Sequence, residues 1–317
     1  MANKNPIQFS VVVPVYNSEG SLKILYRRLS KVFASLNNRW ELILVNDCSR
    51  DNSWNVMQEL ASDNQNVVAV NLTNNFGQHN AIMCGFSFAR GKYVVTMDDD
   101  LQNPPEEIIK LAKTIIDGNY SVVYGLFTTC GYGLLRDYCS AFVHKIISNI
   151  TSSGYTTSSF RIIEHSVVKK IIGFKQYNVM IDVLIKDIVG RRNIGHCRVE
   201  NHPRTIGKSN YSFKKLFLHA LNMIFNYTLW PLRFASMLGF LFSFLGIMLG
   251  VYSLLYYLFY GVSISGWTSI MIAITFFSGA ILFVLGIIGE YIGRIFLNVN
   301  QKPQYFIKEI VSKRKEE

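Results

Sequence analysis

A run of 56 residues without a charged side chain limits what this chain can fold into. Residues 234–289 contain no Asp, Glu, Lys, Arg or His. A soluble core does not need so long an uncharged stretch, whereas a transmembrane helix needs about 20 consecutive apolar residues. The run therefore predicts membrane-embedded segments in the C-terminal third, and the alternative is a buried helical hairpin in a soluble protein.

The uncharged run divides near its middle into two segments. Residues 234–260 and 267–292 are each long enough to span a bilayer, and the short uncharged segment 261–266 joins them. Lys and Arg residues flank both outer ends of the run, and the connecting segment has none. The positive-inside rule then predicts a two-helix hairpin within residues 233–293 of an inner (cytoplasmic) membrane protein, with both termini cytoplasmic.

The flanking regions complete the predicted organisation. Apolar residues at helical spacing in residues 211–232 predict an amphipathic helix at the membrane interface, although a core helix has the same pattern. Residues 294–317 are predicted to form a basic cytoplasmic tail. The N-terminus lacks the apolar segment of a signal peptide, so residues 1–210 should stay on the side where the chain is made. The five cysteines are scattered without a C-x-x-C pair, which argues against a disulfide framework or a zinc site.

The N-terminal part alternates between strand-like and helix-like segments. Near-continuous Val, Ile and Leu runs predict buried strands at residues 9–15, 40–46, 66–72 and 92–98. Helical patterns fall between and after them, at residues 21–36, 53–63, 77–90 and 106–117. The alternation predicts an open α/β domain with a mostly parallel sheet of the nucleotide-binding type, with ligands at the carboxyl ends of its strands.

Acidic residues gather at the end of the fourth predicted strand. Asp98, Asp99 and Asp100 follow one another there, and their mutual repulsion becomes tolerable when a divalent cation neutralises them. If the strand continues to this point, alternate residues share a face, so Asp98 and Asp100 reach one ion while Asp99 points away. An ordinary acidic surface turn is the alternative interpretation of such a motif.

Several motifs together resemble a known family. The blocks Val13-Pro-Val-Tyr-Asn, Val45-Asn-Asp-Cys-Ser-Arg-Asp and Asp98-Asp-Asp-Leu-Gln-Asn-Pro-Pro-Glu resemble the signature of family-2 inverting glycosyltransferases with a GT-A fold. The later blocks His202-Pro-Arg-Thr-Ile-Gly-Lys-Ser-Asn-Tyr and Gly289-Glu-Tyr-Ile-Gly-Arg are similar to the polyprenyl-phosphate branch of that family. That branch includes dolichyl-phosphate mannose synthases, bactoprenol glucosyltransferases and aminoarabinose undecaprenyl-phosphate transferases. The resemblance covers residues 9–306.

The resemblance implies roles for particular residues. Those that line the nucleotide are Pro14, Tyr16, Glu19, Asp47 and Asp99. The metal ligands for Mg²⁺ or Mn²⁺ are Asp98, Asp100 and Gln102. Arg136 and Ser140 receive the lipid phosphate, and Arg204 with Lys208 closes over the phosphates. The chemistry agrees, because a guanidinium group donates two parallel hydrogen bonds to a phosphate. The alternatives are that Arg136 forms a structural ion pair and that Arg204 binds lipid headgroups.

One block departs from the family pattern. Relatives carry an acidic residue shortly before a Phe-Arg-Leu block, often discussed as the general base, whereas this chain reads Ser158-Ser-Phe-Arg-Ile with no carboxylate before Phe160. A phosphate dianion, with a second pKa of about 6, is a competent nucleophile without a base. Asp182 is the substitute base that the sequence offers.

These observations predict an enzyme that moves a sugar from a UDP-sugar to undecaprenyl (polyprenyl) phosphate at the cytoplasmic membrane face. The product would feed modification of a cell-envelope glycan such as lipopolysaccharide. Membrane lipids and further copies of the chain, a tetramer by resemblance, are the expected partners, and nucleic acid is not. A processive polysaccharide synthase is disfavoured because the chain has no Q-x-x-R-W block. A membrane-bound scaffold or a flippase component without catalytic activity stays as the alternative.

Overall fold

The computed structural model describes residues 7–127, 157–175, 179–200, 229–260, 266–300 and 302–314. It divides into two compact units. One comprises Met1–Asn210 with Gln301–Glu317, and the other comprises Tyr211–Asn300.

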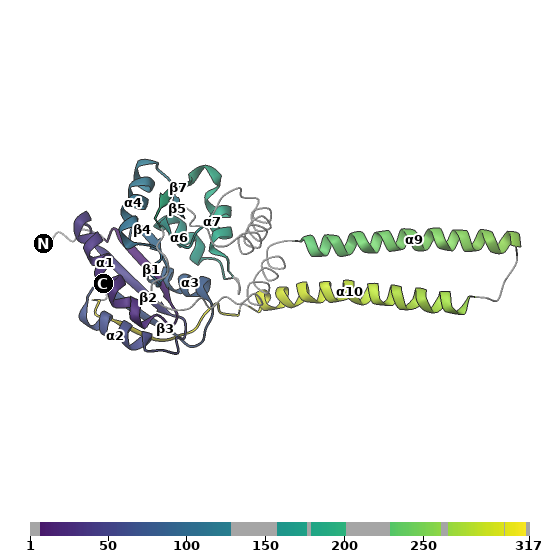
Figure 1. Cartoon of the computed structure of the whole chain (residues 1–317), viewed down its shortest axis with the longest axis horizontal. Coiled ribbons are helices and arrows are strands. Elements are labelled where there is room, and N and C mark those ends of the chain that lie inside the picture. The colour runs from purple at the N-terminus through teal and green to yellow at the C-terminus, as the bar shows by residue number, and fades with distance from the viewer. Residues whose placement is uncertain are drawn as a thin grey trace. The chain divides into compact units, whose positions relative to one another are not determined.

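The first unit is built on an eight-stranded mixed sheet (Figure 1). The strand order is β7-β5-β6-β4-β1-β2-β3-β8. The strands are β1 Phe9–Val15, β2 Trp40–Asn46, β3 Val67–Leu72, β4 Tyr93–Thr96, β5 Val122–Phe127, β6 Arg161–Glu164, β7 Ile194–Val199 and β8 Ile307–Ser312. The central strands β3, β2, β1 and β4 are mutually parallel, whereas β6 and β8 each run antiparallel to their neighbours.

Helices cover both faces of this sheet, which explains why its strands are continuously apolar. The helices of the first unit are α1 Glu19–Leu36, α2 Ser53–Asp63, α3 Gln78–Phe88, α4 Ile108–Asp117, α6 His165–Ile172 and α7 Ile181–Val189, with short 3-10 turns η1 Pro105–Glu107 and η2 Arg191–Asn193. Helices α1, α2 and α4 pack on one face. Helices α3, α6 and α7 pack on the other. The predicted α/β class is therefore confirmed.

Helix α3 lies close to the sheet at Gly85. A Cβ atom added at Gly85 would lie 2.3 Å from Cγ1 of Val12 and 3.3 Å from Cγ2 of Val45. Both valines are buried strand residues with stiff side chains. Only glycine therefore allows α3 to reach this depth against β1 and β2.

The predicted strand over residues 92–98 is too long. In the structure β4 ends at Thr96, and Asp98, Asp99 and Asp100 lie in the turn that follows. The alternation of strand faces therefore does not decide where these carboxylates point. Their positions come from hydrogen bonds to other loops.

The C-terminal tail contains a strand that the sequence analysis did not anticipate. Strand β8 pairs antiparallel with β3 and forms an edge of the sheet. Beyond it, Arg314 forms an ion pair with Glu41, a strand residue that is 1% exposed. The same carboxylate accepts hydrogen bonds from Ser10 Oγ (2.5 Å) and from the backbone N–H of Arg90 (2.7 Å). The tail thus supplies a cation to a buried acidic group of the first unit.

The second unit contains two long helices, α9 Trp230–Tyr260 and α10 Trp267–Val299. Their segments Trp230–Tyr252 and Phe276–Leu297, with mean hydropathies of 2.1 and 1.9, are long and apolar enough to cross a membrane. Most of the predicted interfacial helix, residues 211–228, lies outside the described residues. Near the end of the apolar run, Glu290 and Arg294 form an i,i+4 ion pair at 2.5 Å.

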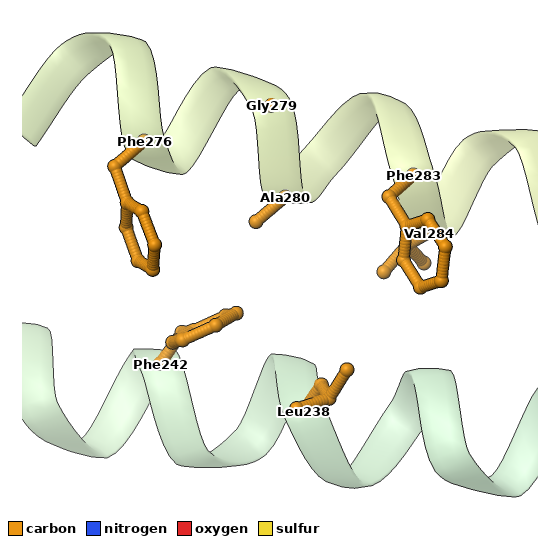
Figure 2. A pocket seen from close by; sticks show the side chains of 7 residues that line it. All are labelled: Leu238, Phe242, Phe276, Gly279, Ala280, Phe283 and Val284. Carbon is orange, nitrogen blue, oxygen red and sulfur yellow. The ribbon is translucent and has the colours of Figure 1, made fainter.

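Helices α9 and α10 face each other through apolar side chains (Figure 2). Phe242 of α9 packs edge-on against Phe276 of α10, with ring centroids 5.2 Å apart. A cavity of about 400 Å³ lies between the helices, and its lining residues are Leu238, Phe242, Phe276, Gly279, Ala280, Phe283 and Val284. No charged group contributes to this lining.

Candidate functional site

Three loops come together at the carboxyl edge of the parallel strands. Strands β2 and β4 flank β1 in the sheet, and all three run parallel, so the residues that follow them emerge at the same edge. The chain proceeds from β1 to β2 and β3 on one side and to β4 on the other. The boundary between β1 and β4 is therefore a topological switch point, the usual ligand position in open α/β sheets.

The loops after β1 and β2 are joined by five hydrogen bonds. They run from Asn17 N to Ser49 Oγ (3.0 Å), from Arg50 N to Asn17 Oδ1 (2.7 Å), from Ser18 N to Ser53 Oγ (2.9 Å), from Glu19 N to Asp51 Oδ2 (3.2 Å) and from Asn52 N to Glu19 Oε2 (2.9 Å). The carboxylate of Glu19 thus holds the neighbouring loop. Of the other predicted nucleotide-lining residues here, Pro14 lies inside β1, and Tyr16 follows it with 37% of its surface exposed.

Asp47 organises the loop that precedes α3. Its two carboxylate oxygens accept hydrogen bonds from the backbone N–H groups of Phe76 (2.7 Å) and Gly77 (2.9 Å). Burial raises the pKa of Asp47, while these two backbone donors lower it. The residue predicted to contact the nucleotide therefore also fixes the start of α3, where Gln78 is the first helical residue.

Asp98 is held by two side-chain donors. Gln78 Nε2 donates to its Oδ1 at 2.5 Å, and Ser159 Oγ donates to its Oδ2 at 2.7 Å. Burial raises the pKa of Asp98, and the charge of Asp100 raises it further, whereas the hydrogen bond from Ser159 lowers it. The positive charge of Arg161 also lowers this pKa, so the carboxylate has a fixed orientation between a negative and a positive neighbour.

Asp99 and Asp100 point to different parts of the site. Asp99 Oδ2 accepts a hydrogen bond from the backbone N–H of Tyr16 at 3.0 Å, across the boundary between β1 and β4. Burial raises the pKa of Asp99 to about 6. Asp100 Oδ1 accepts a hydrogen bond from the backbone N–H of Gln102 at 3.1 Å. The three carboxylates thus serve three separate contacts within one turn.

Backbone strain gathers at the same three loops. Asn17, Cys48 and Leu101 follow β1, β2 and β4, and each has a left-handed backbone with φ of 54°, 59° and 61°. Such a conformation is uncommon for any residue with a side chain and is an outlier for a bulky one such as Leu101. Strained backbone of this kind concentrates at ligand sites, where the surrounding contacts hold it in place.

The candidate metal-ligand atoms in the acidic turn fit a hard divalent cation. All of them are side-chain oxygen atoms, the ligands that Mg²⁺ and Mn²⁺ prefer. Each oxygen of Asp98 accepts one hydrogen bond and has a second acceptor position. The buried side-chain oxygen of Asn103, in the same segment, has no hydrogen-bond donor among the described residues. Among the described residues there is no cluster of three or more His, Cys, Asp or Glu side chains able to hold a metal.

Asp182, the predicted substitute general base, is half-buried and forms an ion pair with a buried arginine. Its Oδ1 contacts the guanidinium of Arg161, which is 1% exposed, and accepts a hydrogen bond from the hydroxyl of Tyr124 at 3.0 Å. Burial and the charge of Asp182 raise the pKa of Tyr124, which keeps its hydroxyl protonated. Because the Oδ1 atom of Asp182 is engaged by both the guanidinium and the phenol, this geometry favours a positioning role for Asp182.

The structure brings together most of the predicted donor-side residues and adds two that the sequence analysis missed. Gln78 and Ser159 both contact Asp98, although they lie 20 and 61 positions away along the chain. The signal for Ser159 was its place one residue before Phe160, in the block that departs from the family pattern. The predicted acceptor-side residues, Arg136, Ser140, Arg204 and Lys208, lie outside the described residues.

Comparison with known proteins gives consistent results. Residues 10–172 match the family described as glycosyl transferase family 2. The chain is 34% identical over 316 residues to an undecaprenyl-phosphate 4-deoxy-4-formamido-L-arabinose transferase of Shewanella sediminis, covering 98% of this chain and 94% of that protein. It is 35% identical over 311 residues to the protein of the same name from Proteus mirabilis, covering 96% and 94%. Among solved structures, glucosyl-3-phosphoglycerate synthase from Mycobacterium tuberculosis in complex with Mn²⁺ and UDP-glucose matches with a TM-score of 0.52 and 17% identity, over 69% of this chain and 77% of that one.

Proposed function

Because the chain belongs to glycosyl transferase family 2, we propose that it transfers a sugar from a UDP-sugar to undecaprenyl phosphate, or another polyprenyl phosphate, at the cytoplasmic face of a membrane. Membership of the family makes the chain a glycosyltransferase with a GT-A fold. The observation that carries the finer proposal is the presence, in one chain, of an acidic site at a switch point and two helices apolar enough to cross a membrane. The relatives named for undecaprenyl phosphate match nearly the whole chain, which supports a lipid acceptor.

The donor half of the proposed site is formed by the three joined loops. Tyr16 offers an exposed aromatic ring for the base, next to a backbone N–H that Asp99 already holds. Pro14, Glu19 and Asp47 keep the surrounding loops in place. The solved neighbour contains UDP-glucose and Mn²⁺, which supports a uridine nucleotide as the donor.

Asp98 and Asp100 are the proposed metal ligands, with Gln102 beside them. A bound Mg²⁺ or Mn²⁺ would stabilise the negative charge of the departing diphosphate. The chain's own contribution is to present oxygen ligands in a fixed orientation, through the contacts of Asp98 with Gln78 and Ser159.

The acceptor half rests on residues outside the described part of the chain. Arg136 and Ser140 are proposed to bind the lipid phosphate, because a bidentate guanidinium compensates the charge of a dianion that leaves water. Arg204 and Lys208 are proposed to close over both phosphates.

Arg136→Ala should raise KM for polyprenyl phosphate while leaving UDP-sugar affinity nearly unchanged. Arg204→Ala should weaken the binding of both substrates. Calorimetric titration of UDP-sugar into each variant separates the two roles.

A separate general base is not part of the proposal. The acceptor phosphate is already a nucleophile near neutral pH, since its second pKa is about 6. The carboxylate of Asp182 is engaged by Arg161 and Tyr124. We therefore assign Asp182 a positioning role within the first unit.

The experiment that tests this function uses purified protein, Mn²⁺, undecaprenyl phosphate and a panel of UDP-sugars, with the lipid product weighed by mass spectrometry. One UDP-sugar should give a lipid-linked sugar and free UDP. If UDP binds but no sugar on the panel is ever transferred, the alternative of a catalytically inactive scaffold or flippase component is favoured. Size measurement in detergent tests the proposed homo-oligomer.

The proposed topology places both termini in the cytoplasm and only residues 261–266 outside. In intact cells, an impermeant thiol reagent should label Ser263→Cys and should not label Ser312→Cys. The native cysteines need prior replacement, and lysed cells serve as the control for reactivity of both positions. The reverse labelling pattern would overturn the proposed orientation.

A further inference from the structure

We propose that Ser159 and Gln78 are positioning residues that fix the carboxylate of Asp98 toward the metal-bound diphosphate of the donor. The inference rests on the proposed function, because it takes Asp98 as a ligand of that metal. It gives a role to Ser159, which lies where the sequence departs from the family pattern. It also connects the buried ion pair of Arg161 and Asp182 to the site.

The two donors approach Asp98 from different elements. Gln78 is the first residue of α3 and donates to Oδ1 at 2.5 Å. Ser159 precedes β6 and donates to Oδ2 at 2.7 Å. Because each oxygen receives a donor, the carboxylate cannot rotate without losing a hydrogen bond. With the donors that the described part of the chain supplies, each oxygen has a second acceptor position at which a cation can bind.

The sheet register explains why Ser159 reaches Asp98. Strands β4 and β6 are antiparallel, with Thr96 opposite Arg161. Extending this register by two residues along each strand places Asp98 opposite Ser159. Thr96 and Arg161 are the last pair of the β4–β6 ladder, so the ladder brings the segments that carry Asp98 and Ser159 close together, and the side-chain hydrogen bond joins them just beyond its end.

A buried hydrogen-bonded chain holds the backbone of Ser159. The hydroxyl of Thr96 donates to the carbonyl oxygen of Ser159 at 2.6 Å and accepts from Nε of Arg161 at 3.2 Å. Arg161 is in turn paired with Asp182 of α7. The ion pair thus anchors the segment that delivers the Ser159 hydroxyl, which gives this buried charge pair a function near the site.

The backbone that carries Gln78 is also held by hydrogen bonds. The carboxylate of Asp47 binds the backbone N–H groups of the two residues before Gln78. The first turn of α3 is therefore tied to the loop after β2. Outer hydrogen bonds of this type orient metal ligands, and their loss typically lowers metal affinity or activity about 10- to 100-fold.

The test compares Ser159→Ala with Ser159→Thr and with a matched control, Ser158→Ala. Ser158 is the adjacent serine, and its hydroxyl accepts from the backbone N–H of Phe160. Calorimetry measures the affinity of the full-length protein for Mn²⁺ in the presence of UDP, and a thermal unfolding scan checks the fold. Ser159→Ala should weaken Mn²⁺ binding about 10-fold. Ser159→Thr, which keeps the hydroxyl, should restore most of the affinity, and Ser158→Ala should match the wild type.

Gln78→Met provides the second arm. It should weaken Mn²⁺ binding by a similar factor, and the double variant with Ser159→Ala should lose more than either single variant. In transfer assays, kcat should fall while KM for polyprenyl phosphate stays unchanged, since the acceptor does not contact these residues in the proposed site. Unchanged Mn²⁺ affinity in folded Ser159→Ala and Gln78→Met would overturn the inference.

The outcomes separate this inference from the proposed function. If the wild type binds Mn²⁺ and UDP but transfers no sugar, the proposed function fails, and the affinity losses still support the positioning roles. If the wild type transfers sugar to the lipid and both variants bind Mn²⁺ as it does, the function stands and the positioning roles are wrong.

Discussion

The two units of this chain solve the problem of burying apolar side chains in different ways. In the first unit, Phe86 of α3 is 1% exposed because two helical layers enclose the sheet. In the second unit, Phe240 of α9 and Phe259 near its end are 77% and 79% exposed. The first unit completes its own core, whereas the second leaves its apolar surface for lipid or for other helices.

The two units also differ in how their charged side chains are placed. The first unit buries Arg161 and Glu41, each 1% exposed, and supplies a partner of opposite charge to both. The second unit has an uncharged run, with the pair of Glu290 and Arg294 at its end. The free-energy cost of burying a charged group is offset where long-range contacts supply a partner of opposite charge. Two long helices alone make few such contacts.

The largest expected effect is the loss of sugar transfer when a proposed metal ligand of the first unit is replaced. Asp98→Asn or Asp100→Asn should abolish sugar transfer, because losing one of the proposed metal ligands removes several kcal/mol of transition-state stabilisation. Product formation on undecaprenyl phosphate is the measurement, with the exposed Asp117→Asn as control. Chelation by EDTA should have the same effect on the wild type. Near-normal turnover in either variant would contradict the metal assignment.

The next effect tests whether the C-terminal tail belongs to the first unit. Arg314→Met should destabilise this unit by about 3 kcal/mol, because it leaves the charge of Glu41 buried without a cation. Denaturant unfolding followed through Trp40 and Trp54 measures the loss. The double variant with Glu41→Gln should be more stable than Arg314→Met, since no charge remains buried. An unchanged midpoint for Arg314→Met would show that the pair contributes nothing.

The same substitution in both units gives the most direct comparison. Gly85→Ala should destabilise the first unit by about 1–3 kcal/mol, because the new methyl group overlaps Val12. Gly246→Ala in α9 should cause no loss, since a Cβ atom there meets nothing within 4 Å in the described structure. Thermal unfolding in detergent compares the two. A loss of stability or a change in oligomeric size for Gly246→Ala would show that another helix packs on this face.

The smallest effect concerns the acid at the end of the apolar run. Glu290→Gln should leave at least about half of the transfer activity, because an i,i+4 pair of this kind is worth about 0.5 kcal/mol. The initial rate of lipid-linked sugar formation is the measurement. A fall of more than about tenfold would instead favour a functional role for an ionisable group at the membrane.

Local pattern was sufficient for much of the first unit. The predicted strands at residues 9–15 and 40–46 and the predicted helix at 53–63 coincide with β1, β2 and α2. Their bounds are encoded nearby, by continuous apolar runs that end at polar residues. The strand over 92–98 was overextended because the hydrophobic run does not reveal where the pairing with β1 and β6 stops, which is at Thr96.

Motif resemblance located the acidic site but not the orientation of its side chains. It placed Asp98, Asp99 and Asp100 together, whereas their partners, such as Gln78, Ser159 and Tyr16, come from three other segments. It offered Asp182 as a base because a carboxylate was missing before Phe160. Its pairing with the fully buried Arg161 could not be read from a sequence in which the two lie 21 positions apart.

The sequence by itself determined the α/β class of the first unit, the two long apolar helices and the acidic turn at a strand end. Each of these depends on composition and periodicity within a short window, where backbone geometry and solvent preference act locally. Tertiary structure alone decided that β8 returns from beyond α10 to pair with β3, and that Ser159 donates a hydrogen bond to Asp98 just beyond the end of the β4–β6 ladder. Both contacts depend on how strands from distant segments pair, and strand register is fixed only when whole faces of the sheet find their buried partners.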